Sequence, residues 1–129
     1  MKYVMDTGVL SLFYLGDERV KPYFGQVQSG RAEGYVSSVN LAEFYYKVCQ
    51  KLGKETATVR FHQTRTILEV VETDGELAMT AGLSKCRHAH LSLADTFAAA
   101  VTEKLGGTLL TTDEAMVRVA EIHVKHFEI

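Results

Sequence analysis

The chain has 129 residues, of which 47% are hydrophobic and 23% charged, a balance that suits one globular domain and excludes a disordered chain. Its formal net charge of −2 excludes a generally basic nucleic-acid coat, so a nucleic-acid ligand needs local positive charge or a bound cation. Asp6 comes too early for a signal peptide, and no apolar run approaches the roughly 20 residues of a membrane span. Cys49 and Cys86 stand in no motif spacing, so we expect reduced thiols in a cytoplasmic protein.

The first half of the chain predicts two strands and four helices. Residues 3–5 form a short apolar run that ends at Asp6, as a buried strand would. Pro22 fits the first turn of a helix, which tolerates proline, and Ser38 is a suitable N-cap for the helix after it. The expected elements are a strand over 2–5, helices over 9–15 and 17–30, a strand over 34–37, and helices over 39–52 and 55–66.

The second half predicts three more strands and three helices. Thr73 and Glu76 have the spacing of a capping box, and Ser92 caps the helix that carries Asp95. The expected elements are strands over 67–71, 108–112 and 123–127, and helices over 73–87, 92–105 and 113–120. Because strands alternate with helices, we expect a single domain with a three-layer α/β/α fold around a mainly parallel sheet.

Four acidic residues stand near the ends of these elements, and each has an ordinary structural explanation. Asp6 and Asp113 follow strands and can cap the next helix. Glu43 can pair with Lys47 one helical turn later. Asp95 can complete a capping box and faces the favourable end of the helix dipole. Taken singly, each acid is better explained in this way.

Their joint placement points to a metal site. In an open parallel sheet, ligands bind beyond the carboxyl ends of the strands, where Asp6 and Asp113 lie. Glu43 lies one turn into the helix after the second strand, and Asp95 opens a helix that approaches from the same side. Clustered carboxylates repel one another, and a hard divalent cation such as Mg²⁺ or Mn²⁺ neutralises them. The cluster therefore predicts metal-dependent cleavage of a phosphodiester.

Other site chemistries match the sequence poorly. His88 and His90 lie close in sequence, but no cysteine pair accompanies them in a zinc-binding spacing. An aspartyl phosphatase of the Asp-x-Asp type needs an acid where Gly8 stands. The chain has neither a GxxxxGK[ST] phosphate loop nor a GxGxxG motif. A hard-metal site is the remaining interpretation.

The segments that carry the four acids resemble the PIN domain. The matching segments are Asp6-Thr7, Ser38-x-x-x-Ala42-Glu43, Leu93-Ala94-Asp95 and Leu109-Leu110-Thr111-Thr112-Asp113. The resemblance covers nearly the whole chain, and the compact length is most similar to the VapC-type toxins of toxin–antitoxin pairs. It implies a magnesium- or manganese-dependent ribonuclease that cuts single-stranded RNA, usually as a homodimer, and whose toxin members are inhibited by a small cognate antitoxin.

The same resemblance implies roles for particular residues. The catalytic and metal-binding carboxylates are Asp6, Glu43, Asp95 and Asp113. Thr7 and Thr112 match polar residues that support the family's first and last acids. Gly8 departs from the Asn or Ser often found at its position, which puts any side-chain contact there in doubt. Glu114 is expected to be a solvated acid beside the site.

Basic residues on two neighbouring helices offer a surface for RNA phosphates. The candidates are Lys47, Lys51, Arg60 and Arg65, with Tyr46 available for base stacking. Taken singly, each of these residues is explained slightly better as part of a solvated charged face.

Two alternatives to a toxin remain open. One is a PIN module that binds metal, RNA or a protein without cutting, and the other is a housekeeping nuclease that processes RNA. Tyr23, Phe24 and Val27 fit either an antitoxin or dimer surface or the core.

Overall fold

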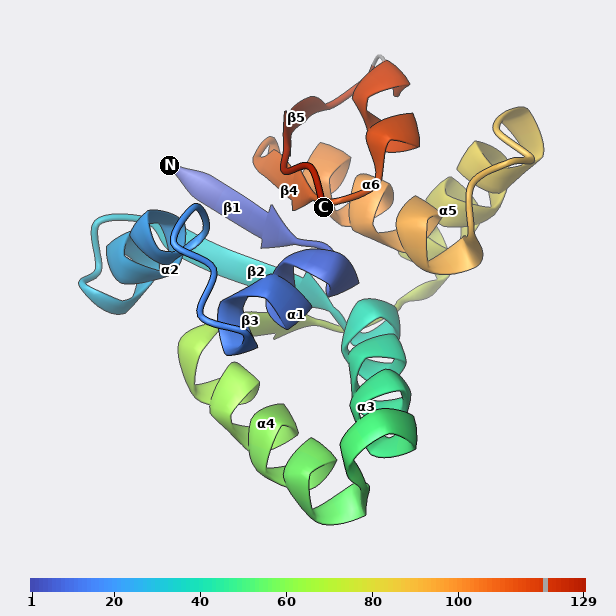
Figure 1. The fold of residues 1–129 in the computed structure, drawn as a ribbon. Coiled ribbons are helices and arrows are strands. Elements are labelled where there is room, and N and C mark those ends of the chain that lie inside the picture. Colours follow the sequence, from blue (N-terminus) through green and yellow to red (C-terminus); the bar gives the residue numbers. More distant parts are fainter. Residues whose placement is uncertain (120) are drawn as a thin grey trace.

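The computed structural model describes every residue except residue 120, and its strands form one parallel sheet. The order of the five strands is β3-β2-β1-β4-β5, so the first strand in the chain lies at the centre (Figure 1). The strands are β1 (Lys2–Met5), β2 (Glu33–Ser37), β3 (Glu69–Val71), β4 (Thr108–Thr111) and β5 (His123–His126). Every pairing is parallel, so the carboxyl ends of all the strands face one edge. The predicted fold class is confirmed.

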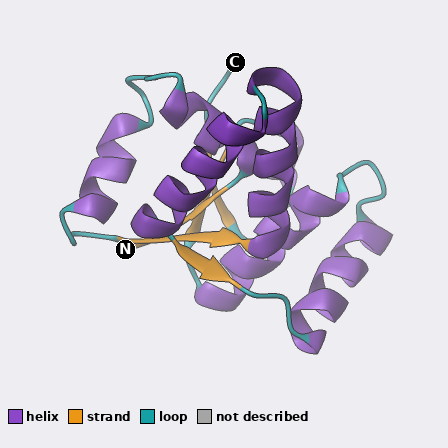
Figure 2. Cartoon of the chain, turned by 90° about the horizontal axis from the view of Figure 1, so that it is seen from below, coloured by secondary structure: helices purple, strands orange, loops and turns teal. Residues whose placement is uncertain are grey.

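Helices lie on both sides of the sheet (Figure 2). In the described part of the chain they are α1 (Thr7–Tyr14), α2 (Lys21–Gln28), α3 (Ser38–Leu52), α4 (Lys54–Ile67), α5 (Gly75–Arg87), α6 (Leu93–Leu105) and the 3₁₀ helix η1 (Glu114–Arg118). Helices α3 and α4 form a hairpin that turns at Gly53, whose φ of 92° suits glycine (Figure 1). Among the described helices, none combines the length and hydropathy that crossing a membrane requires.

Two apolar clusters hold the helical layers against the sheet. Successive residues of β1 point to opposite faces, so Tyr3 and Met5 join the cluster under α1 to α4 while Val4 joins the cluster under α5 and α6. Phe24 and Phe44 are fully buried in the first cluster. The core explanation therefore holds for Phe24, and Tyr23 and Val27 pack against the same cluster.

Two predicted N-caps are wrong by one residue. Ser37, rather than Ser38, caps α3, since its hydroxyl accepts the Asn40 N–H at 2.9 Å. Asp74, rather than Thr73, caps α5 through the N–H of Leu77 at 2.8 Å. In both cases the cap is the last extended residue before the helix, with ψ of 149° at Ser37 and 179° at Asp74.

Several element boundaries also differ from the prediction, most of all at α2, which begins at Lys21 rather than at residue 17. Ile67 ends α4 instead of opening the third strand, because the helix continues one residue beyond Thr66. The short helix expected over 113–120 is a 3₁₀ helix over Glu114–Arg118, and the expected final residue 120 lies outside the described residues. These boundary changes leave the predicted site residues at the carboxyl edge of the sheet.

Candidate metal site

Asp6 is the buried centre of the acidic site. It follows the last residue of β1, and its backbone N–H extends the sheet ladder to the Leu110 carbonyl at 2.9 Å. Its Oδ1 accepts the Thr7 N–H at 2.8 Å and the Asn40 amide at 3.3 Å, while its Oδ2 accepts the Thr111 hydroxyl at 2.6 Å. The residue is only 4% exposed. Asp6 is thus held by hydrogen bonds to both of its oxygens.

Burial raises the pKa of Asp6 despite these hydrogen bonds. Desolvation is the largest cause, and the charges of Glu43 and Asp113 raise the pKa further. The hydrogen bonds from Thr111 and Thr7 act in the opposite direction, because they favour the ionised form. The charges of Glu43 and Asp113 thus add a smaller penalty to the desolvation that already disfavours the ionised form of Asp6.

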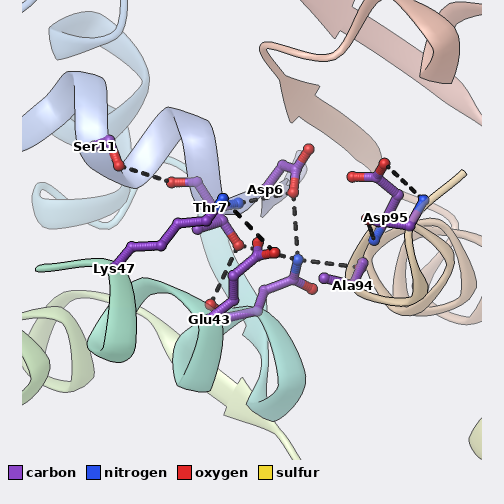
Figure 3. Close-up of polar contacts among 9 residues, drawn as sticks. Asp6, Thr7, Ser11, Glu43, Lys47, Ala94 and Asp95 are labelled. Atoms are coloured by element: carbon purple, nitrogen blue, oxygen red, sulfur yellow. Dashed lines mark hydrogen bonds and ion pairs between the residues drawn. The ribbon is translucent and has the colours of Figure 1, made fainter. Parts of the chain in front are cut away.

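Glu43 faces Asp6 from the second turn of α3. In the view of Figure 3, Asp6 lies between Glu43 and Asp95. The Glu43 carboxylate pairs with Lys47 of the next turn at 3.8 Å, as its sequence spacing predicted. Both partners are partly exposed, so this pair contributes little to stability and can open for another cation.

Asp95 and Asp113 approach each other from different elements. Asp95 forms the predicted capping box with Ser92 at the start of α6, and Asp113 caps η1 through the Ala115 N–H at 2.9 Å. The pKa of Asp95 is raised to about 7 by desolvation first, then by contact with the Asp113 side chain and by the charges of Asp6 and Asp113. Each acid has its ordinary structural role, and Asp6 nevertheless lies within electrostatic reach of the other three acids.

The four acids do not form a tight ligand cluster. Among the described residues, no three acidic, histidine or cysteine side chains come close enough to grip a single ion. Mg²⁺ keeps several of its waters and needs only one or two direct carboxylates, so this spacing suits it. Asp6 could supply one such donor through Oδ2, because Oδ1 already accepts two hydrogen bonds whereas Oδ2 accepts one and keeps a lone pair free. Oxygen donors and excess negative charge fit a hard divalent cation.

Two residues that the sequence analysis missed organise the site. Thr111 is fully buried; its hydroxyl donates to Asp6 and accepts the Asp113 N–H at 3.0 Å, which fixes the direction of its proton. A threonine two residues before an acid is the signal of such a turn. Asn40 is also fully buried and had no comparable signal in the sequence.

The predicted supporting residues lie beside these two. The Thr7 hydroxyl interacts with Asn40, donating to its carbonyl at 3.3 Å. Thr112 covers Gly8 so closely that a Cβ on Gly8 would lie 2.0 Å from the Thr112 Oγ1. Thr112 therefore fills the space that a side chain at position 8 would need. Glu114 is exposed, as expected.

A groove of about 250 Å³ opens next to Glu43, between α1 and the α3–α4 hairpin. Three of the four candidate RNA-binding residues, Lys47, Lys51 and Arg60, line it. Arg65 does not line the groove; its guanidinium lies 5.9 Å from the centre of the Phe61 ring. The remaining lining residues are Ser11, Leu15, Phe44, Val48 and Leu52, which make much of the floor apolar.

The chain belongs to the PIN-domain family, whose sequence profile matches residues 3–122. No curated protein sequence matches it significantly.

Among solved structures, the fold is similar to VapBC from Salmonella typhimurium bound to DNA, with a TM-score of 0.79 and 19% identity over 98% of both chains. It is similar to VapBC2 from Rickettsia felis bound to a promoter DNA fragment, with a TM-score of 0.76 and 17% identity over 99% of this chain and 100% of that one. VapC20 from Mycobacterium tuberculosis, a toxin that cleaves the sarcin-ricin loop, matches with a TM-score of 0.70 and 20% identity over 90% of this chain and 92% of that one. At these identities the likeness shows the fold alone.

Proposed function

We propose that this PIN domain is a Mg²⁺- or Mn²⁺-dependent endoribonuclease that cuts single-stranded RNA and serves as the toxin of a VapBC-like pair. The observation that carries the proposal is the placement of Asp6, Glu43, Asp95 and Asp113 around the carboxyl edge of the sheet, where desolvation first, and then Asp113 and Asp6, raise the pKa of Asp95 to about 7. A bound cation relieves the repulsion between the acids, and the similar VapC20 toxin cleaves the sarcin-ricin loop.

The protein's residues have distinct roles in this chemistry. A divalent cation lowers the pKa of a bound water and stabilises negative charge on the phosphate. Asp6 and Asp95 would be its main ligands, with Glu43 and Asp113 binding a second ion or metal-bound waters. Hydrogen bonds from Thr111 and Asn40 keep the Asp6 carboxylate in one orientation. The family resemblance implies products with 5′-phosphate and 3′-hydroxyl ends.

The groove beside Glu43 is the proposed path of the RNA strand. Lys47, Lys51 and Arg60 bring three positive charges to its rim, which supplies the local positive charge that the net charge of −2 lacks. Replacing Lys47 and Lys51 with glutamate should weaken binding of a single-stranded RNA and reduce its salt dependence by about 0.7 per lost phosphate contact. The matched control is Lys104→Glu, because Lys104 pairs with Asp74 on the opposite helical layer. If wild type, the Lys47/Lys51 double variant and Lys104→Glu bound RNA with the same salt dependence, the groove would not be the path of the RNA.

The antitoxin is proposed to use the same groove. Its floor exposes Leu15 by 80% and Leu52 by 55%, and its rim is basic, so the groove suits an amphipathic protein segment with acidic side chains. The similar structures from Salmonella typhimurium and Rickettsia felis are VapBC complexes bound to DNA. We expect a small partner to co-purify with the protein from its native cells, and Leu15→Asp with Leu52→Asp to release it. Retention of the partner by that double variant would place the partner elsewhere.

Expression in a bacterial host tests the function most directly. Wild type should arrest growth and leave discrete RNA ends, whereas Asp6→Asn should do neither. The purified Asp6→Asn protein should still show a cooperative thermal unfolding transition, which confirms that it is folded. Discrete ends without arrest would instead identify an RNA-processing nuclease. Cleavage by Asp6→Asn at the wild-type rate would refute the metal mechanism, and a wild type that neither cuts nor arrests growth would be a binding module.

The expected homodimer stays a prediction. Light scattering coupled to gel filtration at micromolar concentration should give twice the chain mass of 14.3 kDa. A measured mass of one chain at micromolar concentration would contradict the homodimer.

A further inference from the structure

Asn40 connects the separate pieces of the acidic site. It lies in the first turn of α3, one turn before Glu43, and is fully buried. Its amide nitrogen donates towards three acceptors: Asp6 Oδ1 at 3.3 Å, Thr7 Oγ1 at 3.3 Å and the Ala94 carbonyl at 3.2 Å. These acceptors belong to the end of β1, the start of α1 and the start of α6.

The orientation of the Asn40 amide follows from its neighbours. Its Oδ1 accepts a hydrogen bond from the Ser37 hydroxyl, while the acceptors around its nitrogen include a carboxylate and a carbonyl, which have no hydrogen to donate. The amide therefore cannot be turned over without placing its oxygen against two other acceptor oxygens. No buried side-chain polar atom among the described residues lacks a partner, so the network is complete.

We infer that Asn40 is a positioning residue that sets the separation between Asp6 and Asp95, the two main ligands of the proposed metal. The inference rests on the proposed function. Asn40 binds Asp6 directly, and it binds Ala94, the residue that precedes Asp95 in α6. A single side chain thus ties β1 to the first turn of α6 behind the two carboxylates.

This tie matters because the two acids repel each other. Without a cation between them, like charges push the end of β1 and the start of α6 apart, and any widening must be reversed when the cation binds. The Asn40 amide opposes that movement. It also occupies Asp6 Oδ1, which leaves Oδ2 as the oxygen available to metal. Partners behind metal ligands commonly contribute 10- to 100-fold to metal affinity.

A purely structural role makes a different prediction. If Asn40 only satisfies buried polar groups near the α3 cap, replacing it lowers the melting temperature and leaves the affinity of the folded protein for metal unchanged. If it positions the ligands, affinity falls even when the protein is folded. The two roles are separated by measuring metal binding directly, without RNA.

The test is Mn²⁺ binding to the full chain, followed by electron paramagnetic resonance of the free ion. We expect Asn40→Leu, which keeps the volume and removes the donors, to bind Mn²⁺ at least tenfold more weakly than wild type. Asn40→Ala provides a second variant that introduces no bulk. The matched control is Thr102→Val, which removes a buried hydroxyl that donates to the Ala98 carbonyl in the body of α6 and should leave Mn²⁺ affinity within twofold.

Cleavage assays give an independent readout. The Mn²⁺ concentration for half-maximal cleavage should rise by a similar factor in the Asn40 variants, while the rate at saturating Mn²⁺ changes less. A folded Asn40 variant that binds Mn²⁺ within twofold of wild type would overturn the positioning role and leave the proposed function intact. A wild type that binds no Mn²⁺ would overturn the proposed function itself.

Discussion

Asp95→Asn should stabilise the metal-free protein at pH 8. At that pH the Asp95 carboxylate is ionised beside Asp6 and Asp113, and desolvation and those charges raise its pKa to about 7. Asparagine removes the charge but keeps an oxygen that can accept the Ser92 N–H, as the carboxylate does at 3.3 Å. The capping of α6 is therefore preserved while the repulsion is removed.

The size of this stabilisation follows from the direction and extent of the Asp95 pKa shift. A rise in that pKa from 3.8 to about 7 corresponds to a change in the free energy of unfolding of at most about 4 kcal/mol. Because Asp95 is only partly buried, solvent screening reduces this to about 1–2 kcal/mol. A raised folded-state pKa stabilises the protein fully below the unfolded value of 3.8, and that stabilisation is lost as the pH rises through about 7. Wild type should therefore lose stability between pH 5 and pH 8, and Asp95→Asn should lose less.

Thermal unfolding in EDTA, followed by circular dichroism, measures this difference. At pH 8 the variant should melt about 3–8 °C above wild type, and the gap should narrow by pH 5. Asp74→Asn is the matched control, because Asp74 also caps a helix but its pKa is lowered, by the Leu77 N–H first. An Asp95→Asn protein that melts at or below wild type at pH 8 would refute the picture of mutually repelling acids.

Four further substitutions test the packing in and around the site. Thr111→Val should lower the free energy of unfolding in urea by about 1–3 kcal/mol, because it removes the hydrogen-bond partner of both Asp6 Oδ2 and the Asp113 N–H. An unchanged urea midpoint would contradict that role. Gly8→Ala should lower the free energy of unfolding by about 1–3 kcal/mol, because its Cβ would meet the Thr112 Oγ1 at 2.0 Å. Adding Thr112→Ala should recover part of this loss. If the effects of the two substitutions were simply additive, the clash would be contradicted. Phe44→Ala should cost about 3–5 kcal/mol, since Phe44 is 1% exposed; a loss below 1 kcal/mol would mean that this core relaxes freely.

The sequence predicted those features that depend on local pattern and strand order. The local pattern predicts β1 and β4, and the rule that parallel strands share an edge predicts that Asp6 and Asp113 lie at the same edge of the sheet. The predicted caps of α3 and α5 were each one residue away from the actual caps, Ser37 and Asp74. Neighbouring Ser, Thr and Asp residues are all suitable caps when judged by sequence alone. Only the backbone angles distinguish them.

Residues whose roles depend on distant contacts were harder to predict. Asn40 bonds to Asp6 across 34 residues of sequence, and Thr111 bonds to it across 105. In sequence, Asn40 is an ordinary polar residue of a helix, and Thr111 is one of two adjacent threonines. The family resemblance pointed to Thr112, whereas the hydrogen bond to Asp6 is made by its neighbour.

The central position of β1 has a consequence for synthesis on the ribosome. β1 is made well before β4, so its second edge stays unpaired until β4 is available, and Asp6 has to wait equally long for the Thr111 hydroxyl. Bringing together groups so far apart in sequence carries a loop-closure cost that is repaid only when the last partner arrives. A nascent chain that stops short of β4 therefore has its first acid in place but no assembled cluster.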